Sequence, residues 1–183
     1  MMSGGDWVCW APEYFITSCL AQSLNQIQGG KYVTIENRAY DAFISANAVG
    51  KGRLHGDIRS NGRFDLLLWK AKGDPTAVIE VKNRVCKKMQ YEADLKRIIA
   101  VLKRKRQDST MEFGALAFYS ATDDSPERTA LEKLEQRSST IEKNAKEIVG
   151  SDFCATLHRS KIKVEDKSAW FAGCILIEKK ILK

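Results

Sequence analysis

Two acidic residues and a lysine stand inside apolar segments of the sequence. Asp65 lies in residues 63–69, and Glu80 and Lys82 close residues 76–82. Carboxylate oxygens suit Mg²⁺ or Mn²⁺, and such an ion lowers the pKa of a bound water and offsets charge that develops on a phosphate. An ammonium group such as that of Lys82 can orient the water or stabilise the transition state. Asp65, Glu80 and Lys82 together therefore predict metal-dependent hydrolysis of phosphodiester bonds.

The two segments are predicted to form an antiparallel hairpin, because the residues between them carry the turn signal Gly-Asp-Pro. If the hairpin closes symmetrically with Trp69 opposite Thr76, Asp65 lies opposite Glu80, with Cβ atoms roughly 4.5–5.5 Å apart. Strand alternation places Lys82 on the same face as Glu80. The opposite face is expected to be apolar and to hold Phe64, Leu66, Leu68, Ile79 and Val81.

A surface hairpin with a cross-strand ion pair is the alternative interpretation of these three residues, and such pairs contribute little to stability. The continuous apolar run from Leu66 to Leu68 favours a buried hairpin instead. Charged groups buried in such strands cost several kcal/mol unless they pair, bind a metal or reach water. Packing alone therefore does not explain why Asp65, Glu80 and Lys82 stand in these strands.

The remaining elements that position these residues follow from apolar periodicity and from proline and glycine punctuation. We predict helices over residues 12–27, 88–106 and 125–149, and further strands over 32–36, 112–119, 153–157 and 170–177. Residues 38–62 stay unassigned beyond strand and loop. Helices interleaved with strands predict an α/β fold in which helices flank a central mixed sheet, as one domain over residues 1–183.

The long third helix is predicted to start with Ser125 as its N-cap and Pro126 as its first helical residue. Its apolar stripe is expected to pack on the sheet, and a coiled-coil dimer contact is the alternative. The stripe consists of Leu131, Leu134, Ser138, Ile141, Ala145 and Ile148.

Asp65, fourteen intervening residues and then Glu80-Val81-Lys82 resemble the motif of the PD-(D/E)XK nuclease superfamily. The helices predicted before and after the Glu-x-Lys strand are also similar to that family's core, over about residues 12–119. The resemblance implies a restriction-endonuclease-like fold and an endonuclease acting on DNA, with Mg²⁺ or Mn²⁺ bound by Asp65 and Glu80. Phe64 stands where the motif has proline, and Gln90 is followed four residues later by Asp94 in place of tyrosine.

The family often supplies a third acid from its first helix, and Glu13 is the matching residue here. An acid in the first turn is also favoured by the helix dipole without any ligand role. Asp41 and Asp57 are rival candidates for the third acid. Asp94 is either close to the site or a residue of its helix that faces solvent or pairs with Lys87 or Arg97.

Residues 84–106 carry nine basic side chains against Glu92 and Asp94. A basic run of this kind is often a solvated helix face, but its position directly after the Glu-x-Lys strand predicts contacts with a phosphate backbone. The residues predicted to bind nucleic acid are Arg84, Lys87, Lys88, Arg104 and Arg106.

The composition of the whole chain is compatible with this function. The net charge of +7 suits a polyanionic partner, and 44% hydrophobic with 29% charged residues is typical of a globular protein. Without a membrane-spanning run, a signal pattern at the start or a CxxC pair among five cysteines, we expect a cytoplasmic protein with no membrane association. The alternative function is a catalytically inactive or partner-dependent nucleic-acid-binding subunit of the same fold, and a homodimer or a partner protein is compatible with either.

Overall fold

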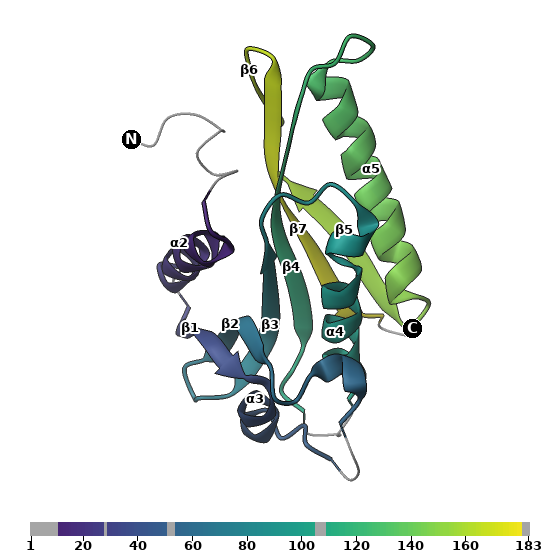
Figure 1. Cartoon of the computed structure of the whole chain (residues 1–183). Helices are drawn as coiled ribbons and strands as arrows, with labels where there is room; N and C mark the ends of the chain where they lie inside the picture. The colour runs from purple at the N-terminus through teal and green to yellow at the C-terminus, as the bar shows by residue number, and fades with distance from the viewer. Residues whose placement is uncertain (1–10, 28, 51–53, 105–108, 181–183) are drawn as a thin grey trace.

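The computed structural model describes residues 11–27, 29–50, 54–104 and 109–180 (Figure 1). A mixed seven-stranded sheet runs through it in the order β1-β2-β3-β4-β7-β5, with β6 paired to β7. Its elements are α2 (Glu13–Asn25), β1 (Lys31–Arg38), α3 (Ala39–Ser45), the 3₁₀ turn η1 (Gly56–Ile58), β2 (Arg63–Lys70), β3 (Pro75–Lys82), the 3₁₀ turn η2 (Lys88–Gln90), α4 (Glu92–Lys103), β4 (Phe113–Asp123), α5 (Ala130–Val149), β5 (Phe153–Arg159), β6 (Lys163–Glu165) and β7 (Ser168–Lys179).

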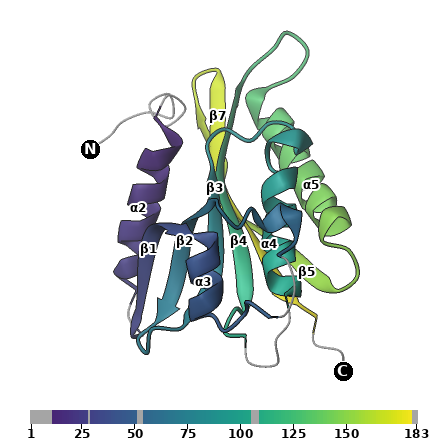
Figure 2. The same cartoon turned by 60° about the horizontal axis from the view of Figure 1, so that its bottom comes forward.

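Helices cover both faces of the sheet, so the predicted α/β class is confirmed. Figure 1 shows α2 on one side and α4 with α5 on the other, and Figure 2 shows α3 beside β1 and β2. Two apolar clusters fill the interfaces. In the smaller cluster, α2 packs on Leu66, Leu68, Ile79 and Val81. In the larger cluster, α4 and α5 pack on the opposite face of the sheet. Burial of these two apolar surfaces is the main force that holds the layers together.

The β2–β3 hairpin has the predicted register in its centre, where Leu66 pairs with Ile79 and Leu68 with Ala77. The prediction for Trp69 was wrong, since Trp69 faces Pro75 across a bulge and not Thr76. The turn itself explains the shift. The Lys70 N–H donates to the Asp74 carbonyl at 2.9 Å, so the loop closes over residues 70–74 and the strand restarts one residue earlier.

Phe64 does not lie on the face predicted for it. It is buried in the larger core beside Phe43, with ring centroids 6.4 Å apart, and not with Leu66 and Leu68 in the smaller one. The pairing of β2 with β3 extends from Trp69 only as far as Leu66. The chain turns away from β3 beyond this point, and simple alternation no longer assigns its side chains.

The helix over 88–106 begins and ends inside its predicted limits, as η2 followed by α4, which stops at Lys103. Its predicted stripe is confirmed: Tyr91, Leu95, Ile98 and Leu102 are all buried.

The predicted start of α5 was wrong. The helix begins at Ala130, where Thr129 and Glu132 form a reciprocal capping box. Ser125 instead pairs with Arg128 in a short turn after β4. Two satisfied backbone donors make Thr129-x-x-Glu132 the stronger start signal. The α5 stripe packs on the sheet as predicted, except that Leu131 is 39% exposed.

The unassigned residues 38–62 contain α3 and η1, and β6 was also not predicted. Within the described ranges, no helix is long and apolar enough to span a membrane. Cys19, Cys86, Cys154 and Cys174 are free thiols, while Cys9 lies outside the described residues.

Candidate active site

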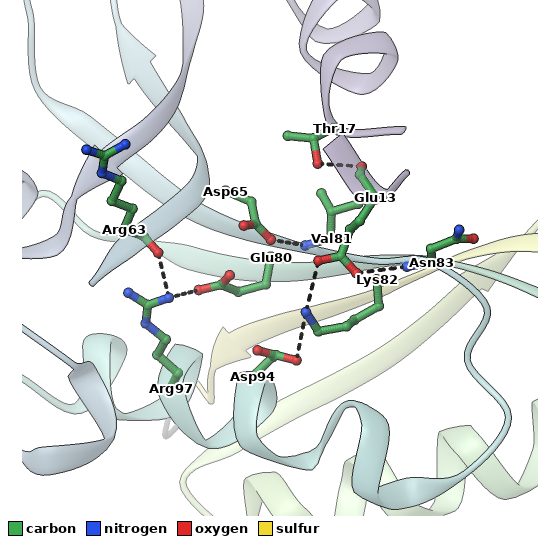
Figure 3. A network of polar contacts seen from close by, with 10 residues as sticks. All are labelled: Glu13, Thr17, Arg63, Asp65, Glu80, Val81, Lys82, Asn83, Asp94 and Arg97. Carbon is green, nitrogen blue, oxygen red and sulfur yellow. Dashed lines mark hydrogen bonds and ion pairs between the residues drawn. The ribbon is translucent and has the colours of Figure 1, made fainter. Parts of the chain in front are cut away.

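The predicted catalytic residues meet near the end of β3, at the edge where β2 separates from it. Figure 3 shows Asp65, Glu80 and Lys82 there, with Glu13 reaching in from α2 and Asp94 from α4. The two helices come from opposite faces of the sheet. The site therefore lies where both helical layers approach the same strand end.

Asp65 is anchored to the backbone of β3. Its Oδ2 accepts a hydrogen bond from the Val81 N–H at 2.7 Å, and the Val81 side chain is fully buried. The carboxylate satisfies a backbone donor at the point where β2 leaves β3. Asp65 is thus bonded to the residue that separates Glu80 from Lys82.

Glu80 is buried, with 2% of its surface exposed, and pairs with Arg97 of α4, which is also buried. The Oε1 of Glu80 lies 2.9 Å from Nη1 of Arg97. A charged hydrogen bond of this length is among the stronger ones in proteins. It offsets part of the cost of burying the guanidinium, and of burying the carboxylate when Glu80 is ionised.

Arg97 is held by more than Glu80. Its Nη1 also donates to the Arg63 carbonyl at 2.7 Å, and its Nε donates to the Ile58 carbonyl at 3.2 Å. The guanidinium carbon lies 4.4 Å from the centre of the Phe64 ring. The same side chain therefore joins α4, η1 and the start of β2.

The pKa of Glu80 is raised to about 8, and burial of the carboxyl is the largest cause. The positive charge of Arg97 lowers the pKa again but offsets only part of the burial. The nearby charges of Asp65 and Asp94 raise it further, as does a hydrogen bond to Asp65, which favours the neutral form of Glu80. Glu80 therefore keeps its proton at pH values where an ordinary glutamic acid has released it.

Lys82 lies between two acids. Its Nζ is 3.3 Å from Oε1 of Glu13 and 3.6 Å from Oδ2 of Asp94. Burial by itself would lower the pKa of Lys82, but the charges of Asp94, Glu13 and Asp65 outweigh it and raise the pKa above its ordinary value. Lys82 is thus held as an ammonium ion at neutral pH.

Glu13 ties α2 to the end of β3. Its Oε2 accepts the Asn83 N–H at 3.1 Å, while its Oε1 accepts from Lys82. The Asn83 amide in turn donates to the Ala11 carbonyl at 2.7 Å. Both carboxylate oxygens of Glu13 therefore face Lys82 and Asn83, and its role as a third metal ligand stays a prediction.

Asp94 lies at the site, which is one of the alternatives left open for it. Burial raises its pKa, the charge of Lys82 lowers it, and the charge of Asp65 raises it again. The rivals Asp41 and Asp57 are both exposed, on α3 and η1. Asp57 lies 3.4 Å from Nδ1 of His55.

The pairing of Arg97 with Glu80 was not predicted, because Arg97 stands within the basic run that follows β3. Asp94 and Arg97 are three residues apart, so they share a face of α4. That face also contains the buried positions Ile98 and Val101. An acid and a base on an otherwise apolar helix face were the signal in the sequence that could have indicated buried partners for Asp94 and Arg97.

The donor chemistry of Asp65 and Glu80 fits Mg²⁺ or Mn²⁺, since both supply carboxylate oxygens. Across the described ranges, no group of three His, Cys, Asp or Glu side chains is arranged to hold a metal ion.

The described residues among those predicted to bind nucleic acid lie in two places, before α4 and at its C-terminal end. Arg84, Lys87 and Lys88 are exposed on the segment between β3 and α4. Arg104 is partly buried and its Nε donates to the Ala48 carbonyl at 3.0 Å. Arg106 lies outside the described residues.

Comparisons with protein-family models, with curated proteins and with solved structures gave no match to this chain.

Proposed function

We propose that this chain is a metal-dependent nuclease with a restriction-endonuclease-like fold, and that it acts as an endonuclease on DNA. The observation that carries the proposal is the meeting of Asp65, Glu80 and Lys82 at one end of β3. A helix before the Glu-x-Lys strand and a helix after it, α2 and α4, also agree with the PD-(D/E)XK resemblance.

Each residue has a distinct role in this proposal. Asp65 and Glu80 hold Mg²⁺ or Mn²⁺ through their carboxylate oxygens. When bound, the ion supplies a Lewis acid and a water with a lowered pKa. Lys82, kept charged by Glu13 and Asp94, orients the attacking water or neutralises charge on the phosphate. Asp94 and Glu13 position Lys82, and Glu13 is also the candidate third metal ligand.

The second candidate is a nucleic-acid-binding subunit of the same fold that is inactive or that cuts only with a partner. The ion pair between Arg97 and Glu80 favours it, because one oxygen of the second metal ligand already has a cationic neighbour at 2.9 Å. The intact set of Asp65, Glu80 and Lys82 favours the nuclease.

Incubation of the purified protein with supercoiled plasmid and Mg²⁺ or Mn²⁺, with a chelator control, separates the two. We expect nicking that requires the metal and that falls by at least about 100-fold, an order typical of lost electrostatic catalysis, in Asp65→Asn, Glu80→Gln and Lys82→Met. Gln is chosen at position 80 because it retains a hydrogen-bond acceptor for Arg97.

Lys70→Met is the matched control. Lys70 ends the same strand that contains Asp65, but it pairs with Glu112 on the surface. The control should cut like the parent. Metal-dependent binding of DNA without cleavage in the parent would favour the second candidate, and near-parental cutting by any of the three site variants would refute the assigned roles.

A further inference from the structure

The guanidinium of Arg97 occupies space beside the carboxylate to which the proposed function assigns a metal ion. Figure 3 shows Arg97 approaching Glu80 from α4 while Asp65 lies on the other side of Glu80. We infer that Arg97 is a resident counter-ion of the metal site, and that a divalent cation binds Glu80 against its charge. The inference rests on the proposed function and adds a determinant of metal affinity.

Arg97 cannot move aside without breaking interactions that do not involve Glu80. The carbonyls of Ile58 and Arg63 accept from its Nε and Nη1, and its guanidinium lies over the Phe64 ring. Its Nη2 is close to Gly62, where an added Cβ would come within 3.3 Å of it. The charge is therefore fixed in place by the surrounding fold.

One nitrogen of Arg97 gives a reason to expect a role beyond packing. Nη2 of Arg97 is buried and has no hydrogen-bond acceptor among the described residues. A buried unpaired donor on a cation is costly. A side chain selected only to join η1, β2 and α4 could be neutral.

The sign of the effect on metal binding does not depend on the protonation of Glu80. If Glu80 is ionised, Arg97 repels an incoming charge of +2. If Glu80 is protonated, the metal replaces a proton, and the charge of the site still rises by one. Arg97 also lowers the pKa of Glu80 and so favours its ionised form, but at similar distances it repels a charge of +2 more strongly than it attracts one carboxylate. Neutralisation of Arg97 therefore strengthens metal binding.

The test compares Arg97→Met with Arg97→Lys. Arg97→Met removes the charge and keeps an apolar stem, while Arg97→Lys keeps the charge and removes the forked hydrogen bonds. Arg63→Met is the matched control, because the Arg63 side chain is 55% exposed and pairs with Glu36. Mn²⁺ affinity is measured by calorimetry, and the Tm of each protein is measured with and without Mn²⁺.

We expect Arg97→Met to have a lower Tm without metal, yet to bind Mn²⁺ on the order of tenfold or more tightly. Unit charges a few ångströms apart at an effective dielectric constant of about 20 would give a larger factor, so tenfold is the lower bound. Its Tm should also rise more with Mn²⁺ than that of the parent. Arg97→Lys should keep the parental affinity with a lower Tm, and Arg63→Met should match the parent in both.

A second measurement uses the parent protein alone, in case Arg97→Met does not fold. Bound Mn²⁺ should broaden the NMR signals of the Arg97 side-chain N–H groups before those of Arg104. Unchanged signals of Arg97 with Mn²⁺ bound, or equal or weaker affinity in a folded Arg97→Met, would overturn the inference. Failure of the proposed function has a different signature: neither the parent nor Arg97→Met binds Mn²⁺, or Asp65→Asn and Glu80→Gln leave the binding unchanged.

Discussion

The carboxylate of Asp65 accepts a hydrogen bond from the backbone N–H of Val81, with 2.7 Å between oxygen and nitrogen. Val81 lies between Glu80 and Lys82 in β3. Asp65, one predicted metal ligand, is therefore hydrogen-bonded to the strand that contains Glu80, the other. The same hydrogen bond satisfies a backbone donor that the separation of β2 from β3 would otherwise leave without a strand partner.

This hydrogen bond predicts different effects for two substitutions of Asp65. Asp65→Ala should lower the unfolding free energy by about 1–3 kcal/mol, because the buried Val81 N–H is left without an acceptor. Asp65→Asn keeps a carbonyl oxygen and should remain near the parent in stability, although its side chain carries no negative charge. Urea unfolding of both variants measures the difference. Equal stability of Asp65→Ala and the parent would show that the hydrogen bond does not matter.

The raised pKa of Glu80 predicts how stability depends on pH. The pKa is 4.5 for the ordinary group and about 8 in the folded protein, so between these values the folded state holds a proton that the unfolded state has released. The free energy of unfolding should therefore fall as pH rises through this window, by at most about 1.36 kcal/mol per pH unit. The contribution is complete below the lower value and lost above the upper one.

Glu80→Gln should make the stability profile flatter, since glutamine does not titrate. Part of the slope should remain, because burial also raises the pKa of Asp94. Urea unfolding between about pH 4 and pH 9 covers the window. Glu112→Gln is the control, because hydrogen bonding to Lys70 lowers the pKa of that exposed group. A variant profile as steep as that of the parent would exclude Glu80 as the titrating group.

The exposed bases after β3 are the predicted contacts with DNA. Replacement of Arg84, Lys87 and Lys88 by glutamine should weaken binding similarly for unrelated sequences, because phosphates carry no base identity. The slope of log affinity against log salt should become less steep by about 0.9 for each phosphate that the variant no longer neutralises on duplex DNA. Titration at several salt concentrations gives the slope.

Arg104→Gln tests the alternative for the same basic run. The guanidinium of Arg104 bonds to the carbonyls of Ala48 and Val49, so its removal should lower stability by about 1–3 kcal/mol and leave the salt slope unchanged. A reduced salt slope in this variant would assign Arg104 to DNA binding after all. An unchanged slope in the triple variant would place the DNA elsewhere on the protein.

The start of α5 gives a prediction that is independent of function. Thr129→Ala removes the capping side chain and should cost about 1 kcal/mol of unfolding free energy. Ser125→Ala should change stability by less than about 0.5 kcal/mol, as a surface substitution outside any cap. Thermal or urea unfolding of the two variants compares them directly. The reverse order would mean that the helix starts at Ser125.

The sequence by itself determined the elements whose signals are local. Apolar runs marked β2 and β3, helical spacing marked α2 and α4, and the central register of the hairpin was predicted correctly although its turn was not. These features depend on side chains a few residues apart along one chain segment. Asp65, Glu80 and Lys82 could be selected at that level, because charged residues in apolar strands require compensation.

Only the tertiary structure decided what each of those charges faces. The pairing of β2 with β3 ends at Leu66, Phe64 lies in the other core, and Asp65 accepts a hydrogen bond from the Val81 N–H. Packing of the layers places α4 against β3. Arg97 therefore pairs with Glu80, which lies seventeen positions earlier in the sequence. Such pairings depend on how helices pack on a sheet, and no spacing along the chain encodes that distance.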